Sequence, residues 1–91
     1  MKPELSTVPK LAPGVRLDEK KAGSKMLHMP ERVLQLNNTS FEIIRLCDGK
    51  HTVQQIAEKL QALYSRAEPL RITDDVLEYL AFLREERAID F

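Results

Sequence analysis

The spacing of apolar residues changes once along this chain, at Asn37-Asn38, and this change limits the available folds more than any other feature. Before it, apolar and polar side chains alternate over short segments, which is the period of a half-buried strand. After it, apolar side chains recur every three to four residues, which is the period of an amphipathic helix. The sequence therefore predicts a small sheet followed by helices, in the α+β class.

Three segments before this change have the pattern of strands. They cover residues 15–18, 26–29 and 32–36, and they are separated by a charged loop and by the turn Pro30-Glu31. Links this short join antiparallel neighbours. We therefore expect a three-stranded antiparallel sheet.

The first part of the chain has a different composition. Residues 1–13 contain three of the five prolines and show no sustained periodicity. Because proline lacks an amide donor and restricts the residue before it, we expect a flexible N-terminal segment or linker over residues 1–13. The domain itself is then expected over residues 14–91.

Sequence signals at the ends of the first two helices predict where these helices begin and stop. Residues 39–42 and 52–55 have the spacing of a capping box, in which the two outer side chains satisfy unpaired amides at a helix start. Thr39 and Thr52 are the expected caps. Gly49, after Asp48, is expected to end the first helix because glycine readily adopts the left-handed conformation.

The third helix is expected to begin near Thr73, after a break at Glu68-Pro69, and to end near Arg87. Residues 88–91 are expected to form a short extended segment. The order is therefore three strands followed by three helices. This is the layout of a winged helix-turn-helix-like domain.

The chain offers few groups for catalysis or metal binding. Its single cysteine and two widely separated histidines form no disulfide framework and no metal-ligand spacing. There is no serine elbow and no glycine-rich phosphate loop, and we expect Cys47 to be a buried core residue. We therefore expect no enzymatic activity, no cofactor and no bound metal.

Targeting segments are missing from the printed sequence. The longest uninterrupted apolar run, residues 79–83, is five residues long, whereas a membrane-spanning helix needs about 18 or more. The start of the chain also lacks the apolar stretch of a signal peptide. We expect a cytoplasmic protein that does not bind membranes.

Charge argues against nucleic-acid binding. The chain has 14 basic and 14 acidic residues, and residues 72–87, the third helix, contain five acidic side chains against two basic ones. A phosphate backbone attracts cationic surfaces, so we expect no nucleic-acid partner. A winged-helix DNA-binding regulator and a non-catalytic structural subunit of a larger enzyme stay as alternatives.

The third helix is unusually apolar in its middle. Seven of the eight residues 76–83 are apolar or aromatic, and Tyr79 and Phe82 point about 100° away from the stripe that would face a core. This second face either packs inside the domain or lines a groove. If residues 32–36 form an edge strand, its unpaired backbone groups could add an extended peptide beside that groove.

Several segments together resemble the PqqD family of pyrroloquinoline quinone biosynthesis. They are Pro13-Gly14-Val15-Arg16-Leu17, Pro30-Glu31-Arg32-Val33-Leu34-Gln35-Leu36-Asn37, Glu42-Ile43-Ile44-Arg45-Leu46-Cys47-Asp48-Gly49, Thr52-Val53-x-x-Ile56 and Asp75-Val76-Leu77-x-x-Leu80-x-x-Leu83. The resemblance covers roughly residues 10–91. It implies a non-catalytic peptide chaperone, a recognition element for ribosomally made and modified peptides. Such a chaperone binds the precursor peptide PqqA and presents it to the radical SAM enzyme PqqE, which cross-links a glutamate and a tyrosine of that peptide.

The resemblance also implies a site. In that family the peptide lies between the third strand and the third helix. Carried over by element, the expected peptide-binding residues are Arg32, Val33, Leu34, Gln35, Leu36, Asp75, Val76, Tyr79, Phe82 and Leu83. Fusion to another enzyme of the pathway, and the choice between a monomer and a domain-swapped dimer, stay open at this point.

Overall fold

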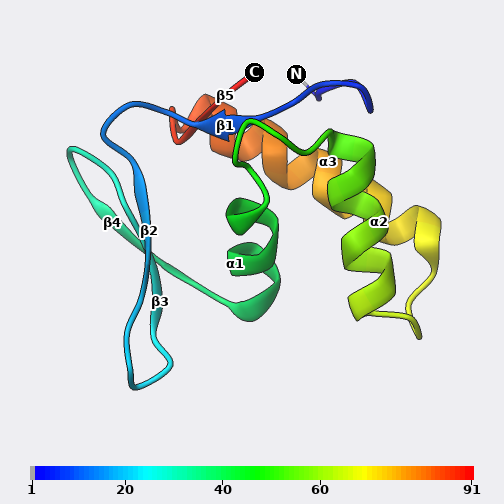
Figure 1. The fold of residues 1–91 in the computed structure, drawn as a ribbon, viewed down its shortest axis with the longest axis horizontal. Helices are drawn as coiled ribbons and strands as arrows, with labels where there is room; N and C mark the ends of the chain where they lie inside the picture. The colour runs from blue at the N-terminus through cyan, green and yellow to red at the C-terminus, as the bar shows by residue number, and fades with distance from the viewer. Residues whose placement is uncertain (1) are drawn as a thin grey trace.

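The computed structural model describes residues 2–91 and has a small sheet on one side and helices on the other (Figure 1). The elements in chain order are β1 (Lys10–Leu11), β2 (Arg16–Glu19), β3 (Lys25–His28), β4 (Val33–Leu36), α1 (Asn38–Arg45), α2 (Val53–Leu63), α3 (Pro69–Glu85) and β5 (Ile89–Asp90). β2, β3 and β4 form an antiparallel sheet in that order, and β1 pairs with β5 in a separate two-stranded sheet. The predicted α+β class and the order of three strands and three helices are confirmed.

The sheet has one face on the core and one face open. Leu27, in the central strand, is fully buried and lies opposite Leu17 on one side and Leu34 on the other. These two neighbours are partly buried and pack against the same core. Because side chains alternate along a strand, the residues between them point to the other face, where the His28 ring lies 3.2 Å from the Asp18 carboxylate.

The first helix begins earlier than the sequence predicted. Asn37 is its N-cap, and the Asn37 side chain accepts a hydrogen bond from the Ser40 amide at 2.8 Å. The capping box predicted at Thr39 is therefore wrong, because asparagine caps at least as well and comes two residues sooner. Thr39 lies inside the helix, and its hydroxyl donates to the Tyr64 hydroxyl at 3.0 Å.

The second helix begins as predicted. The Thr52 hydroxyl accepts from the Gln55 amide, and the Gln55 side chain accepts from the Thr52 amide, so the capping box is complete. Two further amides at this end, those of Val53 and Gln54, donate to carbonyls of Thr7 and Leu5. All four amides at this helix start therefore have partners.

The contacts of residues 2–13 differ from the flexible segment or linker that we expected at the start of the chain. Within residues 2–13, the first strand pairs with β5, Pro9 is fully buried, and the Pro9 carbonyl accepts from the Gly49 amide at 3.0 Å. The segment is attached to the domain along its length rather than leading into it. Proline composition alone did not reveal this because the contacts use backbone carbonyls, which proline keeps.

The third helix begins at Pro69, four residues before the predicted Thr73. Proline fits the first helical position because its missing amide would have no partner there. Asp74 and Asp75 therefore lie beyond the first turn, where the helix dipole does little for them. The predicted extended segment at the end of the chain is confirmed as β5.

The core lies where the three helices meet the sheet. Its fully buried members include Ile56 and Leu60 of α2 together with Val76, Leu80 and Leu83 of α3. Within residues 2–91, no helix is both long and apolar enough to cross a membrane.

Candidate functional site

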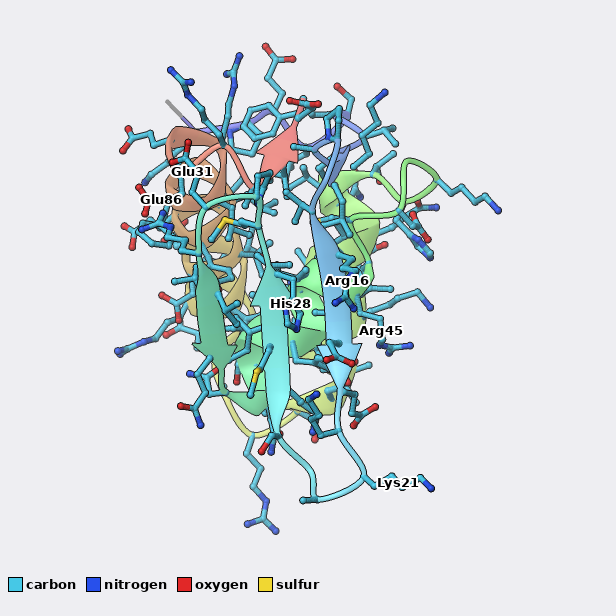
Figure 2. All side chains as sticks on the ribbon, turned by 90° about the vertical axis from the view of Figure 1, so that its left-hand side faces the viewer. Arg16, Lys21, His28, Glu31, Arg45 and Glu86 are labelled. Atoms are coloured by element: carbon cyan, nitrogen blue, oxygen red, sulfur yellow. The ribbon has the colours of Figure 1, made fainter. Side chains whose placement is uncertain are left out.

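The three-stranded sheet has two outer edges, and they differ in chemistry. The β2 edge and the turn after it carry charge at almost every position, in the run Arg16-Leu17-Asp18-Glu19-Lys20-Lys21, whereas β4 reads Val33-Leu34-Gln35-Leu36 without a charge. Figure 2 shows Arg16 on β2, at the edge of the sheet opposite β4. Charged side chains on an edge discourage pairing with another chain. The β4 edge is therefore the one open to an added strand.

The register shows which backbone groups of β4 face outward. The Met29 amide donates to the Arg32 carbonyl at 2.9 Å, so these two residues form a hydrogen-bonded pair. In an antiparallel ladder such pairs alternate with pairs that do not bond to each other. Val33 lies opposite His28, and Gln35 lies opposite Met26. Both are pairs whose two residues do not hydrogen-bond to each other. The N–H and C=O groups of Val33 and Gln35 therefore point away from β3, toward the open edge.

Two observations relate the position of α3 to that of β4. Arg32, at the start of β4, forms an ion pair with Glu86, directly after the end of α3. Thr39, just beyond the end of β4, lines the same pocket as Asp75, which lies in the first half of α3. Figure 2 shows α3 behind β4, with Glu86 near the top of that strand. From Asp75 to Glu86 the helix rises by about 16 Å, and β4 with Arg32 spans about 13 Å.

Two aromatic side chains stand on this side of α3. The rings of Tyr79 and Phe82 are stacked with centroids 5.9 Å apart, and Phe82 is 46% exposed. Burial raises the pKa of the Tyr79 hydroxyl, and the nearby Ser40 side chain partly offsets that rise. Tyr79 is thus anchored between the core and α1, while Phe82 offers apolar surface to a partner.

The strip between the strand and the helix is bounded by half-buried leucines. Leu34 and Leu36 are on the core-facing side of β4 and pack against the core, as Tyr79 does from α3. With Phe82, these residues define what we call the β4–α3 strip. Within residues 2–91, β4 pairs with β3 alone, so no strand of the chain itself covers the strip's open edge.

Two of the predicted site residues lie elsewhere. Leu83 is fully buried and Val76 is 1% exposed, so both belong to the core. Neither side chain faces the open edge of β4, because with Leu80 they follow the helical stripe that faces the other helices; as peptide contacts they stay predictions. The remaining predicted residues lie along β4 and on the accessible side of α3. They are Arg32, Val33, Leu34, Gln35, Leu36, Asp75, Tyr79 and Phe82.

A pocket lies at the end of the strip where β4 begins. It has a volume of about 470 Å³ and is lined by the turn between β3 and β4 and by the residues after α3. The ion pair between Arg32 and Glu86 crosses it. Glu86 and Ser40 were missed as site residues because their contacts join parts of the chain that no local pattern relates.

Among residues 2–91, the single cysteine, Cys47, lies in the core and not on the β4–α3 strip. Burial, and to a smaller degree the nearby Asp48, raise the pKa of the Cys47 thiol to about 12, so it stays a protonated core residue. Among residues 2–91, no group of three or more histidine, cysteine or acidic side chains is arranged to hold a metal ion. The arrangement can bind a chain by strand addition and by apolar contact.

Comparisons with known proteins identify the family and the fold. The family model for coenzyme PQQ synthesis protein D (PqqD) matches residues 16–89. A PqqA binding protein of Xanthomonas axonopodis pv. citri is 33% identical over 82 residues, which are 89% of this chain and 88% of that protein. The bifunctional coenzyme PQQ synthesis protein C/D of Methylorubrum extorquens is 38% identical over 86 residues, 93% of this chain. The chain spans only 23% of that longer protein.

A solved structure has the same fold. The solution NMR structure of the PqqD part of PqqCD from Methylobacterium extorquens superposes with a TM-score of 0.79 at 36% sequence identity. The match covers 97% of this chain and 94% of that one. That protein is described as a functional, stand-alone recognition element for ribosomally synthesized and post-translationally modified peptides.

Proposed function

The chain belongs to the PqqD family, and from that premise we propose that it is a non-catalytic chaperone that binds the precursor peptide PqqA on the open edge of β4. We place the binding domain at residues 14–91, with residues 2–13 packed against it through β1 and the start of α2. The peptide lies antiparallel or parallel to β4 as a fourth strand of the sheet. The observation that carries this proposal is the uncharged edge of β4 beside the exposed face of Phe82, opposite a β2 edge that is heavily charged.

The backbone contacts alone would hold the peptide weakly. The outward N–H and C=O groups of Val33 and Gln35 offer four hydrogen bonds, each worth about 0.5–1.5 kcal/mol net. Association costs at least about 4 kcal/mol in lost freedom of motion. Side-chain contacts are therefore needed as well, and Leu34, Leu36 and Phe82 offer them along the β4–α3 strip.

Moderate affinity suits a protein that must release its cargo. We extend the proposal to presentation of the bound PqqA to the radical SAM enzyme PqqE, in the cytoplasm. When the peptide adds to β4, its alternate side chains point to the open face of the sheet, beside Val33 and Gln35. They remain accessible to an enzyme while the rest of the peptide stays bound.

A proline substitution at a residue whose amide points outward from β4 tests strand addition at this edge. Gln35→Pro removes one donor to the peptide and no ladder bond within the sheet, so the domain should still fold, since proline is tolerated on edge strands. The matched control is Glu19→Pro, because the Glu19 amide faces outward from β2 in the same way. We expect Gln35→Pro to weaken PqqA binding by about tenfold or more in calorimetry, and Glu19→Pro to leave it unchanged. Equal affinities for both variants would refute strand addition at β4.

Presentation to PqqE needs a separate experiment. We expect the chain, PqqA and PqqE to co-elute as one complex in size-exclusion chromatography, and the Gln35→Pro variant to lose PqqA from that complex. The same elution profiles across a concentration series show whether the free chain is a monomer or a dimer. Binding of PqqE to PqqA with equal affinity whether or not the chain is present would contradict a presenting role.

A further inference from the structure

A second pocket lies beyond the end of β4, where the three helices meet. It has a volume of about 200 Å³, and its inner wall is formed by four residues that are each at most 8% exposed: Ile43, Leu60, Ile72 and Val76. The rest of the lining comes from Thr39, Tyr64, Ala67 and Asp75. The proposed contacts along β4 do not use it.

The polar groups of this pocket are gathered at its mouth. The Thr39 hydroxyl donates to the Tyr64 hydroxyl at 3.0 Å, which holds the half-exposed Tyr64 ring at one side. The exposed carboxylate of Asp75 lies at another side. Water in the interior would find few partners, because a stable buried water makes about three hydrogen bonds. The interior is therefore better suited to an apolar group than to water.

The size fits one large apolar side chain. An apolar cavity of about 150 Å³ is enough to hold benzene, so 200 Å³ accepts the side chain of a leucine, methionine or phenylalanine. Covering a group of this kind contributes about 1.5–3 kcal/mol. The pocket could thus supply a large part of the affinity that the backbone contacts lack.

The pocket lies on the path of a chain bound to β4. Thr39 follows Leu36, the last residue of β4, by three positions, which is about 10 Å even in extended chain. On α3, Asp75 precedes Tyr79 by one helical turn. A peptide that leaves the β4–α3 strip past Leu36 therefore reaches the mouth within about three residues.

We infer that the peptide bound on β4 continues past Leu36 and inserts an apolar side chain of the leucine, methionine or phenylalanine class into this pocket. The Asp75 carboxylate accepts hydrogen bonds from the peptide amides next to that side chain. Strand pairing on β4 alone would leave Asp75 without a role in binding. This inference rests on the proposed function, because it takes the peptide on β4 as its starting point.

A substitution that fills the pocket tests the inference. Ala67 lines the mouth and is exposed, so Ala67→Phe can place its ring inside without removing a core residue. The control is Ala62→Phe, which changes an exposed alanine that lines a different surface with His51 and Lys59. We expect Ala67→Phe to weaken PqqA binding by about tenfold or more, and Ala62→Phe to change it by less than about twofold.

Contacts in the wild-type complex provide a direct readout that does not depend on a variant folding. With methyl-labelled protein and unlabelled PqqA, we expect NOEs from one apolar side chain of PqqA to the methyl groups of Ile43, Ile72 and Val76. Alanine at that one PqqA position should reduce affinity as much as Ala67→Phe does.

The outcomes separate the two proposals. If Gln35→Pro weakens binding but PqqA gives no NOE to these methyl groups, the pocket inference is overturned and the β4 edge stands. If PqqA gives the NOEs and Gln35→Pro has no effect, the pocket is a peptide site but the strand-addition model from which we derived it fails. Intermolecular NOEs to the same methyl groups between labelled and unlabelled copies of the chain, without peptide, would assign the pocket to a second copy and also overturn the inference.

Discussion

Phe82→Ala separates binding from folding more cleanly than any other substitution in the β4–α3 strip. Phe82 is 46% exposed in the free chain, so about half of its side chain already lies in water. An aromatic side chain has about 150–250 Å² to bury, which leaves roughly 90 Å² for a partner to cover. At about 25 cal/mol per Å², full coverage contributes about 2 kcal/mol.

We therefore expect the alanine variant to bind PqqA about 30-fold more weakly than the parent chain. The free variant should lose only the stacking with Tyr79, worth about 0.5–1.5 kcal/mol, and should show a native circular dichroism spectrum. Leu5→Ala is the matched control, because Leu5 is 44% exposed and lies in the N-terminal segment away from β4. Isothermal titration calorimetry with synthetic PqqA measures all three affinities.

Two results would refute the reasoning. An affinity of Phe82→Ala within about twofold of the parent would mean that the peptide does not cover this ring. An equal loss in Leu5→Ala would mean that the effect comes from general loss of apolar surface, not from the strip.

Three further predictions concern the scaffold. Thr52→Ala removes one half of the capping box at α2, and we expect urea denaturation to show a loss of about 0.5–2 kcal/mol in the free energy of unfolding. Burial by itself would raise the pKa of Asp48, but hydrogen bonds from the His51 ring and from the Lys50 and His51 amides lower it to about 2. The folded chain thus gains stability from ionised Asp48 above about pH 4 and loses it as the pH falls toward 2. Asp48→Ala should melt at a lower temperature than the parent at pH 6, with the gap closing in melts near pH 2. Cys47 should react with Ellman's reagent only after unfolding, because burial raises the pKa of its thiol to about 12; rapid reaction of the native chain at pH 8 would contradict this.

The sequence predicted those parts of the fold that depend on short-range patterns. The alternating segments became β2, β3 and β4, and the Thr52 capping box was confirmed because all its partners lie within four residues. The start of α1 was misplaced because two good caps, Asn37 and Thr39, stand two residues apart, and local spacing does not choose between them. The start of α3 was misplaced because Pro69 was taken as a break, although proline fits the first helical position equally well.

The parts that could not be predicted depend on contacts between distant residues. β1 has only two residues, and its partner β5 is at the other end of the chain, so no periodicity reveals it. The same is true of Glu86 opposite Arg32 and of the pocket beyond β4, whose walls come from three helices. Leu83 was assigned to the site because the middle of α3 is apolar on more than one face, and only the packing shows which face is the core.

The two edges of the sheet give the strongest reason to place the peptide at β4. Both β2 and β4 pair with the same central strand, β3, and each has four residues. Pairing with β3 therefore gives no reason for one edge to be charged and the other not. An uncharged open edge is a liability, because it can pair with any exposed strand. The β4 edge lies beside Phe82, an exposed aromatic ring that the core does not need. A peptide that regularly binds along this edge would account for both features. Chain-to-chain association through β4 in the free protein should accordingly decrease when PqqA is added, since both compete for the outward groups of Val33 and Gln35.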